Sequence, residues 1–143
     1  MEYLKEFVDY GLIGFLLMMS VVAVAIGVER WLVYRQVRLS DFTDRREFEI
    51  FLTSRLHVVG TIASNAPYIG LLGTVLGIMA TFYMMGGTET VDPKAIMKGL
   101  ALALKATAIG LLVAIPSVTM YNFLLRRVKV LLMRWDSENE RNG

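Results

Sequence analysis

Residues 65–79 read NAPYIGLLGTVLGIM and lie inside an uncharged run that extends from His57 to Thr88. When the chain is turned by about 100° per residue around Thr74, the small residues of this run fall on one face, whereas bulky Leu71 points elsewhere. The members of that face, besides Thr74, are Ala63, Pro67, Gly70, Gly77 and Thr81. The pattern predicts a membrane-spanning helix with one narrow, mildly polar side.

Two further stretches are almost free of charge. Gly11 to Val28 has no charged residue, and Gly99 to Leu125 has only Lys105. A helix over the last stretch would be about 40 Å long, against about 30 Å for the hydrocarbon core of a bilayer. The hydrophobic content of 55% and the mean hydropathy of +0.52 also indicate a membrane protein. We therefore expect an all-α polytopic protein with three transmembrane helices, of which the second and third are long and extend into the cytoplasm.

Basic residues indicate the orientation of these helices. They gather in the first connection and in the tail, and are Arg30, Arg35, Arg38, Arg45, Arg46 and Arg55, then Arg126, Arg127, Lys129, Arg134 and Arg141. Both segments are therefore expected on the cytoplasmic side, with the N-terminus outside and the C-terminus inside. The predicted segments are an interfacial helix (1–10), transmembrane helices (11–28, 58–85, 99–125), a cytoplasmic helical loop (29–57), a periplasmic loop (86–98) and a cytoplasmic tail (126–143).

Two local patterns predict where helices begin. Asp44, followed three residues later by Glu47, resembles a capping box, and a helix that opens there could run into the second span. Before the third span, Asp92 and Pro93 are typical of an N-cap followed by a first-turn proline.

The third span also has a narrow face, which Ala103, Thr107, Gly110, Ala114 and Val118 form. Such faces are common where membrane helices pack closely, and this interpretation assigns Gly70, Gly73, Gly77 and Gly110 to helix packing. Threonine hydroxyls can also bond to carbonyls of their own helix. The functional alternative is that Thr74, Thr81 and Thr107 line a pore or proton pathway. Pro67 and Pro116 interrupt the helical hydrogen bonding and predict kinks.

Lys105 is the one ionisable residue inside the apolar part of the third span. An unpaired ammonium in hydrocarbon is costly, so we expect one of two arrangements. Either the side chain reaches the headgroup region, or it pairs with an acidic residue on another subunit. A lowered pKa with a neutral amine is the remaining alternative.

Several kinds of site are excluded by composition. The chain has no cysteine and one histidine, so we expect no metal site, no cofactor and no enzymatic centre. The glycines of 70–77 lack the Lys-Ser/Thr ending of a nucleotide-binding loop. Basic residues of 30–55 alternate with acids, which suits anionic lipid better than nucleic acid. The three apolar stretches lack Asp and Glu, so a proton-driven mechanism would need a carboxylate from another chain.

The run 65–79 resembles the second-span motif of the ExbB, TolQ and MotA group, and it is closest to ExbB and TolQ. The run 106–116, followed by Tyr121-Asn122, is similar to the matching third span, and Glu29-Arg30 closes the first span in the same way. The resemblance covers essentially the whole chain, although its cytoplasmic parts are short. MotA is a poorer match because it has a fourth span and a larger cytoplasmic region.

The resemblance implies a homopentamer in the bacterial inner membrane that surrounds the helices of an ExbD-like protein. The partner's membrane Asp would carry the proton, with Thr74 and Thr107 facing it, and a TonB-like protein would transmit the motion to outer-membrane import of iron chelates. One departure concerns Leu102, where many relatives have Glu, together with Lys105 at a usually apolar place. Two alternatives stay open: a TolQ-like role in outer-membrane integrity, and a membrane scaffold that conducts no protons.

Overall fold

The computed structural model describes residues 2–87 and 90–142, and these residues form helices and connections without strands. The elements are α1 (Glu2–Gln36), a short 3₁₀ turn η1 (Leu39–Asp41), α2 (Arg45–Thr53), α3 (Leu56–Met85) and α4 (Pro93–Asn142). The all-α prediction is therefore confirmed.

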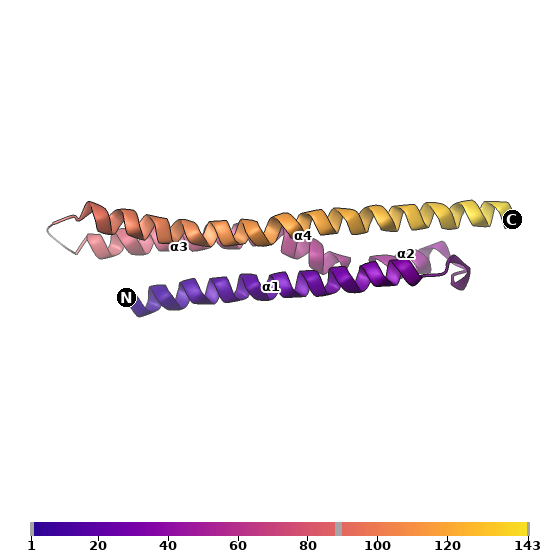
Figure 1. Ribbon diagram of the computed structural model, residues 1–143, viewed down its shortest axis with the longest axis horizontal. Helices are drawn as coiled ribbons and strands as arrows, with labels where there is room; N and C mark the ends of the chain where they lie inside the picture. The colour runs from indigo at the N-terminus through magenta and orange to yellow at the C-terminus, as the bar shows by residue number, and fades with distance from the viewer. Residues whose placement is uncertain (1, 88–89, 143) are drawn as a thin grey trace.

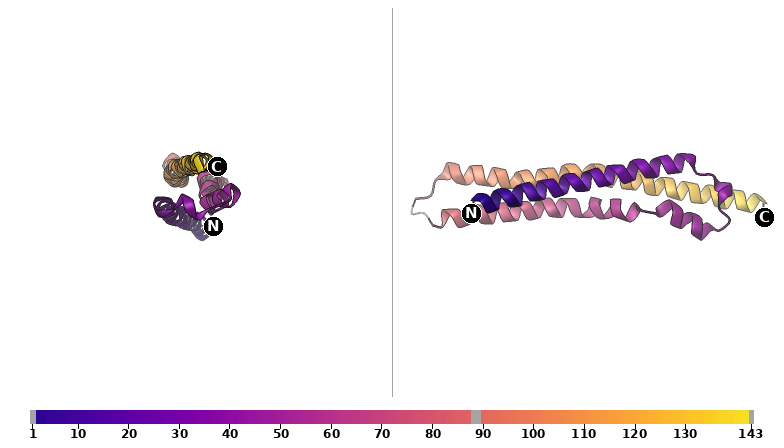
Figure 2. Two further views of the ribbon diagram at one scale, coloured as in Figure 1. Left: turned by 90° about the vertical axis from the view of Figure 1, so that its right-hand side faces the viewer. Right: turned by 90° about the horizontal axis from the view of Figure 1, so that it is seen from below.

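The three long helices lie side by side along one axis (Figure 1). α1 and α4 run in the same direction and α3 runs in the opposite direction, so α3 and α4 form a long antiparallel hairpin with α1 packed beside it (Figure 2). α2 is a short helix beside the C-terminal part of α4. α3 and α4 share more of the tertiary contacts than any other pair of elements, so the small residues on their facing sides decide how closely they approach.

In the described part of the chain, three helices are long and apolar enough to cross a membrane, namely Glu6–Gln36, Leu56–Met85 and Pro93–Arg141. Large apolar side chains remain exposed along them, for example Met79 at 61% and Leu112 at 71%. Lipid tails solvate such side chains at no cost, whereas water does not. The chain is a multi-pass membrane protein, as the sequence predicts.

α1 is longer at both ends than the apolar stretch from Gly11 to Val28. Residues 2–10, for which the sequence predicts a short interfacial helix, form the first turns of α1 and no separate element. Neither Gly11 nor Gly14 interrupts the helix, and a side chain at either would have no neighbour within 4 Å. With no proline or loop between the segments, the backbone hydrogen bonds simply continue.

α4 begins as the sequence predicts. The Lys94 N–H donates to Asp92 Oδ1 at 3.1 Å, and the Ile96 N–H donates to the Asp92 carbonyl at 3.2 Å, so the N-cap and the first-turn Pro93 are confirmed. The helix therefore starts inside the segment 86–98 that was predicted as a loop. It then continues without a break through Arg126 to Asn142.

The N-cap of α2 is also confirmed, because the Asp44 carboxylate accepts the Arg46 N–H at 3.1 Å. The expected continuation into the second span does not occur, since α2 ends at Thr53 and α3 begins at Leu56. Arg55 between them has φ of 67°, in the left-handed region, and this conformation breaks the helical hydrogen-bond ladder.

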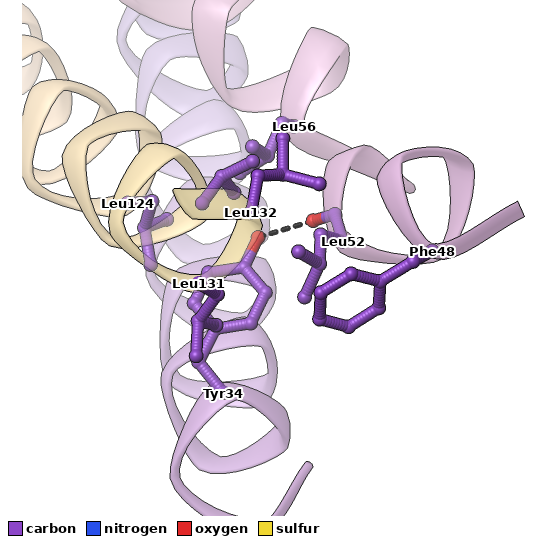
Figure 3. Packing of buried hydrophobic residues seen from close by; sticks show 8 residues of the cluster. Tyr34, Phe48, Leu52, Leu56, Leu124, Leu131 and Leu132 are labelled. Carbon is purple, nitrogen blue, oxygen red and sulfur yellow. Dashed lines mark hydrogen bonds between the residues drawn. The ribbon is translucent and has the colours of Figure 1, made fainter. Parts of the chain in front are cut away.

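Side chains of α1 hold this break in place. The Tyr34 hydroxyl donates to the Leu52 carbonyl (Figure 3), and Arg30 Nη1 donates to the Phe51 carbonyl at 2.9 Å. Carbonyls in the last turn of a helix lack intrahelical partners, so both bonds cap α2 from outside. The surrounding apolar cluster consists of Phe48, Leu52, Leu56, Leu124, Val128, Leu131 and Leu132.

We expect Tyr34→Phe to lower the thermal midpoint of the protein in its membrane by about 4 °C. The change leaves a buried carbonyl without its donor, which costs about 1–2 kcal/mol. Tyr68→Phe is the matched control, because Tyr68 is 69% exposed and its hydroxyl makes no hydrogen bond to the residues that the structure describes. Equal midpoints for the two variants would contradict the capping role of Tyr34.

Candidate functional site

Two threonine hydroxyls meet in the interface between α3 and α4. Thr74 Oγ1 and Thr107 Oγ1 are hydrogen-bonded to each other. Thr74 Oγ1 also lies 3.0 Å from the Ala103 carbonyl oxygen, and Thr107 Oγ1 lies 3.3 Å from the Gly70 carbonyl oxygen. Each hydroxyl can therefore donate across the interface, to the other hydroxyl or to a carbonyl of the opposite helix. The four oxygens form one polar cluster in the α3–α4 interface.

Glycines allow the helices to approach closely enough for this cluster to form. A Cβ on Gly70 would lie 2.8 Å from the Ala106 carbonyl oxygen, and one on Gly110 would lie 2.8 Å from the Ala66 carbonyl oxygen. Both contacts are with backbone atoms, which have no alternative rotamer. The short reach of a threonine side chain spans the interface only because the backbones are this near.

The same face of α3 continues toward the loop between α3 and α4. A Cβ on Gly73 would lie 2.6 Å from Ala106 Cβ, and one on Gly77 would lie 2.7 Å from Ala103 Cβ. Thr81 is 2% exposed and donates to the Gly77 carbonyl of its own helix at 2.9 Å. Thr81 thus shares the face but is not part of the Thr74–Thr107 cluster.

Burial differs between the two central threonines. Thr74 is 7% exposed, whereas Thr107 is partly exposed at the edge of the hairpin. Of the two side chains, that of Thr107 is therefore the more accessible from outside this chain.

Lys105 does not join the cluster. Its side chain is exposed and lines a pocket between α1 and α4, together with Glu6 and Asp9. Sequence reasoning assigned the lysine either to the headgroups or to another subunit and did not bring α1 into contact with it. The available signal was the spacing of Glu6 and Asp9, which places both acids on one face of α1.

Both predicted kink residues lie inside continuous helices, Pro67 in α3 and Pro116 in α4. Neighbouring polar side chains bond to nearby backbone carbonyls. Asn65 Nδ2 donates to the Thr61 carbonyl at 2.9 Å, and the Ser117 hydroxyl donates to the Val113 carbonyl at 2.7 Å. These carbonyls are close to, but not the same as, the ones that each proline deprives of an N–H partner.

A second polar cluster, which the sequence did not indicate as a unit, joins α1 to the break between α2 and α3. The Glu29 carboxylate accepts Arg30 Nη2 at 3.0 Å and Arg55 Nη1 at 2.6 Å. Arg30 itself is 5% exposed, and its guanidinium lies over the Phe51 ring. These charge-assisted hydrogen bonds link α1 to the segment between α2 and α3.

In the described residues no group of histidine, cysteine and acidic side chains is arranged to hold a metal ion. The site consists of hydroxyl and carbonyl oxygens buried between two membrane-spanning helices. Fold and site together define a multi-pass helical membrane protein with a hydroxyl cluster inside its helix hairpin.

Comparison with known sequences specifies that class. The profile of the MotA/TolQ/ExbB proton channel family matches residues 37–137, so the chain belongs to this family. It is 55% identical over 137 residues to the biopolymer transport protein ExbB of Aquifex aeolicus, which covers 96% of this chain and 93% of the relative. It is 56% identical over 133 residues to the ExbB-like 2 protein of Helicobacter pylori, covering 93% of this chain and 89% of the relative. The chain is an ExbB-like member of the family.

Similarity to TolQ is more limited. The chain is 43% identical to the Tol-Pal system protein TolQ of Haemophilus influenzae over 95 residues, which are 66% of this chain and 41% of that protein. The matched family is a proton channel family.

Proposed function

We propose that this chain forms the ring subunit of a proton-motive-force motor in the bacterial inner membrane. The observation that carries the proposal is the Thr74–Thr107 hydroxyl cluster within a membrane hairpin of a proton-channel family member. A hydroxyl can both donate and accept hydrogen bonds, so it can take part in a hydrogen-bonded proton pathway without carrying a charge itself. The names of the relatives from Aquifex aeolicus and Helicobacter pylori support an ExbB-like role in biopolymer transport.

Proton storage must come from elsewhere, because a threonine hydroxyl does not ionise under physiological conditions. The apolar stretches at 57–88 and 99–125 contain no Asp or Glu. We propose that an ExbD-like partner supplies a transmembrane Asp and that the ring, a homopentamer, encloses the partner's helices. The partly exposed Thr107 would then face this acid.

Proton flow would produce motion of the ring relative to the enclosed helices. A TonB-like protein would transmit this motion to outer-membrane receptors that import iron chelates. A TolQ-like role in outer-membrane integrity is the second candidate, because the match to TolQ includes 66% of the chain.

Deletion of the gene in its native host tests the two candidates together. We expect loss of ferric-chelate uptake under iron limitation, with normal detergent resistance and motility, and restoration of uptake by the wild-type gene. Detergent leakage with normal uptake would instead assign the chain to the TolQ-like role. Normal behaviour in all three assays would contradict both.

A further inference from the structure

A pocket that contains charged side chains lies between the N-terminal turns of α1 and the first half of α4. Its volume is about 210 Å³, and it is lined by Glu6, Asp9, Tyr10, Ile13, Leu102, Lys105 and Ala106. The lining residues of α1 have the spacing of one helix face, and so do those of α4. We call this the Lys105 pocket. It places two carboxylates of α1 and one ammonium of α4 in the same pocket.

The Lys105 pocket brings opposite charges together, because the ammonium of Lys105 shares it with the carboxylates of Glu6 and Asp9. An isolated ammonium or carboxylate at membrane depth is costly, but opposite charges attract more strongly where the surroundings are apolar. The described residues show no direct ion pair between Lys105 and Glu6 or Asp9. The volume of the pocket admits water molecules, which can bridge such groups as effectively as a direct bond.

We propose that Glu6 and Asp9 are the counter-charges of Lys105, so that the ammonium is compensated within its own chain and α1 is held against α4. The two acids hold α1 in position by their attraction to Lys105 on α4. This inference goes beyond the proposed function, because it holds whichever cargo or partner the motor has. It also removes the need for a second chain to supply the partner of Lys105.

Charge reversal tests the pairing by thermal unfolding of the full-length protein in its native membrane. Lys105→Glu places a third carboxylate in the pocket and is expected to lower the midpoint by about 4 °C or more. Asp9→Lys or Glu6→Lys alone should also lower it. Combining Lys105→Glu with one of these reversals should restore most of the loss, because an acid and a base again face each other.

Neutral variants test the same pairing in case a reversed charge prevents the protein from folding. Lys105→Met leaves two carboxylates without a counter-charge and should be less stable than the triple variant Glu6→Gln, Asp9→Asn, Lys105→Met. Lys98→Glu is the matched control, since Lys98 is exposed on the same helix and does not line the pocket. It should neither lower the midpoint nor respond to reversal of Asp9.

Two outcomes would overturn the proposal. An unchanged midpoint in Lys105→Glu and Lys105→Met would mean that the side chain lies in the headgroup region. A lowered midpoint that neither the reversals nor the triple variant restores would mean that the partner acid is on another chain. Both readouts are independent of transport, so failure of the motor hypothesis would leave them interpretable.

Discussion

Gly110→Ala is expected to force α3 and α4 apart and to lower the thermal midpoint by about 3–8 °C. The added Cβ would lie 2.8 Å from the Ala66 carbonyl oxygen and 2.9 Å from Gly70 Cα. No rotamer change can relieve a clash with backbone, so the helices themselves must shift, at a cost of about 1–3 kcal/mol. Thermal unfolding in native membranes, with membrane abundance followed by immunoblotting, measures this effect. Uptake should fall as well, since the Thr74–Thr107 cluster depends on the close approach.

Gly14→Ala is the matched control for Gly110→Ala. It makes the same substitution within a helix, but nothing lies within 4 Å of the added Cβ. Alanine is a better helix former than glycine by about 0.5–1 kcal/mol, so the midpoint should stay the same or rise. An equal loss in both variants would mean that close packing of α3 on α4 is not what Gly110 provides.

Thr107→Val is expected to reduce energised uptake to the level of the deletion strain while the protein still folds. Valine keeps the shape of threonine but loses the hydrogen bond to Thr74 and the approach to the Gly70 carbonyl. A hydrogen bond between membrane helices contributes on average only about 0.6 kcal/mol and at most about 1.7 kcal/mol, which is too little to unfold the hairpin. Uptake per unit of folded protein in membranes therefore separates a functional hydroxyl from a structural one.

Thr119→Val controls for the loss of a threonine hydroxyl from α4. Thr119 is exposed and donates to the Ile115 carbonyl of its own helix at 3.0 Å, so its loss should leave uptake unchanged. A passive scaffold predicts normal uptake in both variants. Full uptake by Thr107→Val at normal abundance would therefore reject the proton-pathway role of this hydroxyl.

Sequence patterns that act over a few residues predicted much of this fold. The uncharged runs determined which segments are membrane-spanning helices, and Asp44, Asp92 and Pro93 located two helix starts correctly. The break at Arg55 was missed, because no glycine or proline marks it. Its left-handed backbone conformation is held by contacts with Glu29, which lies far away in the sequence.

For the candidate site residues, too, the sequence predicted local features but not the tertiary contacts. Helical periodicity placed Thr74 and Thr107 on the narrow faces of their helices, yet it could not decide whether those faces meet each other, a pore or another chain. The tertiary structure brings the two hydroxyls together inside the hairpin and places Lys105 in the same pocket as Glu6 and Asp9.

The sequence by itself determined the membrane class, the three spans and the side of each helix on which small residues lie. Hydrophobic burial and capping are local properties, and a window of one helix contains the information for both. Only the tertiary structure decided which helix faces meet and which residues along the two helices lie opposite each other. That choice depends on the summed contacts of segments far apart in the chain, such as Gly70 against Gly110, and no single helix encodes it.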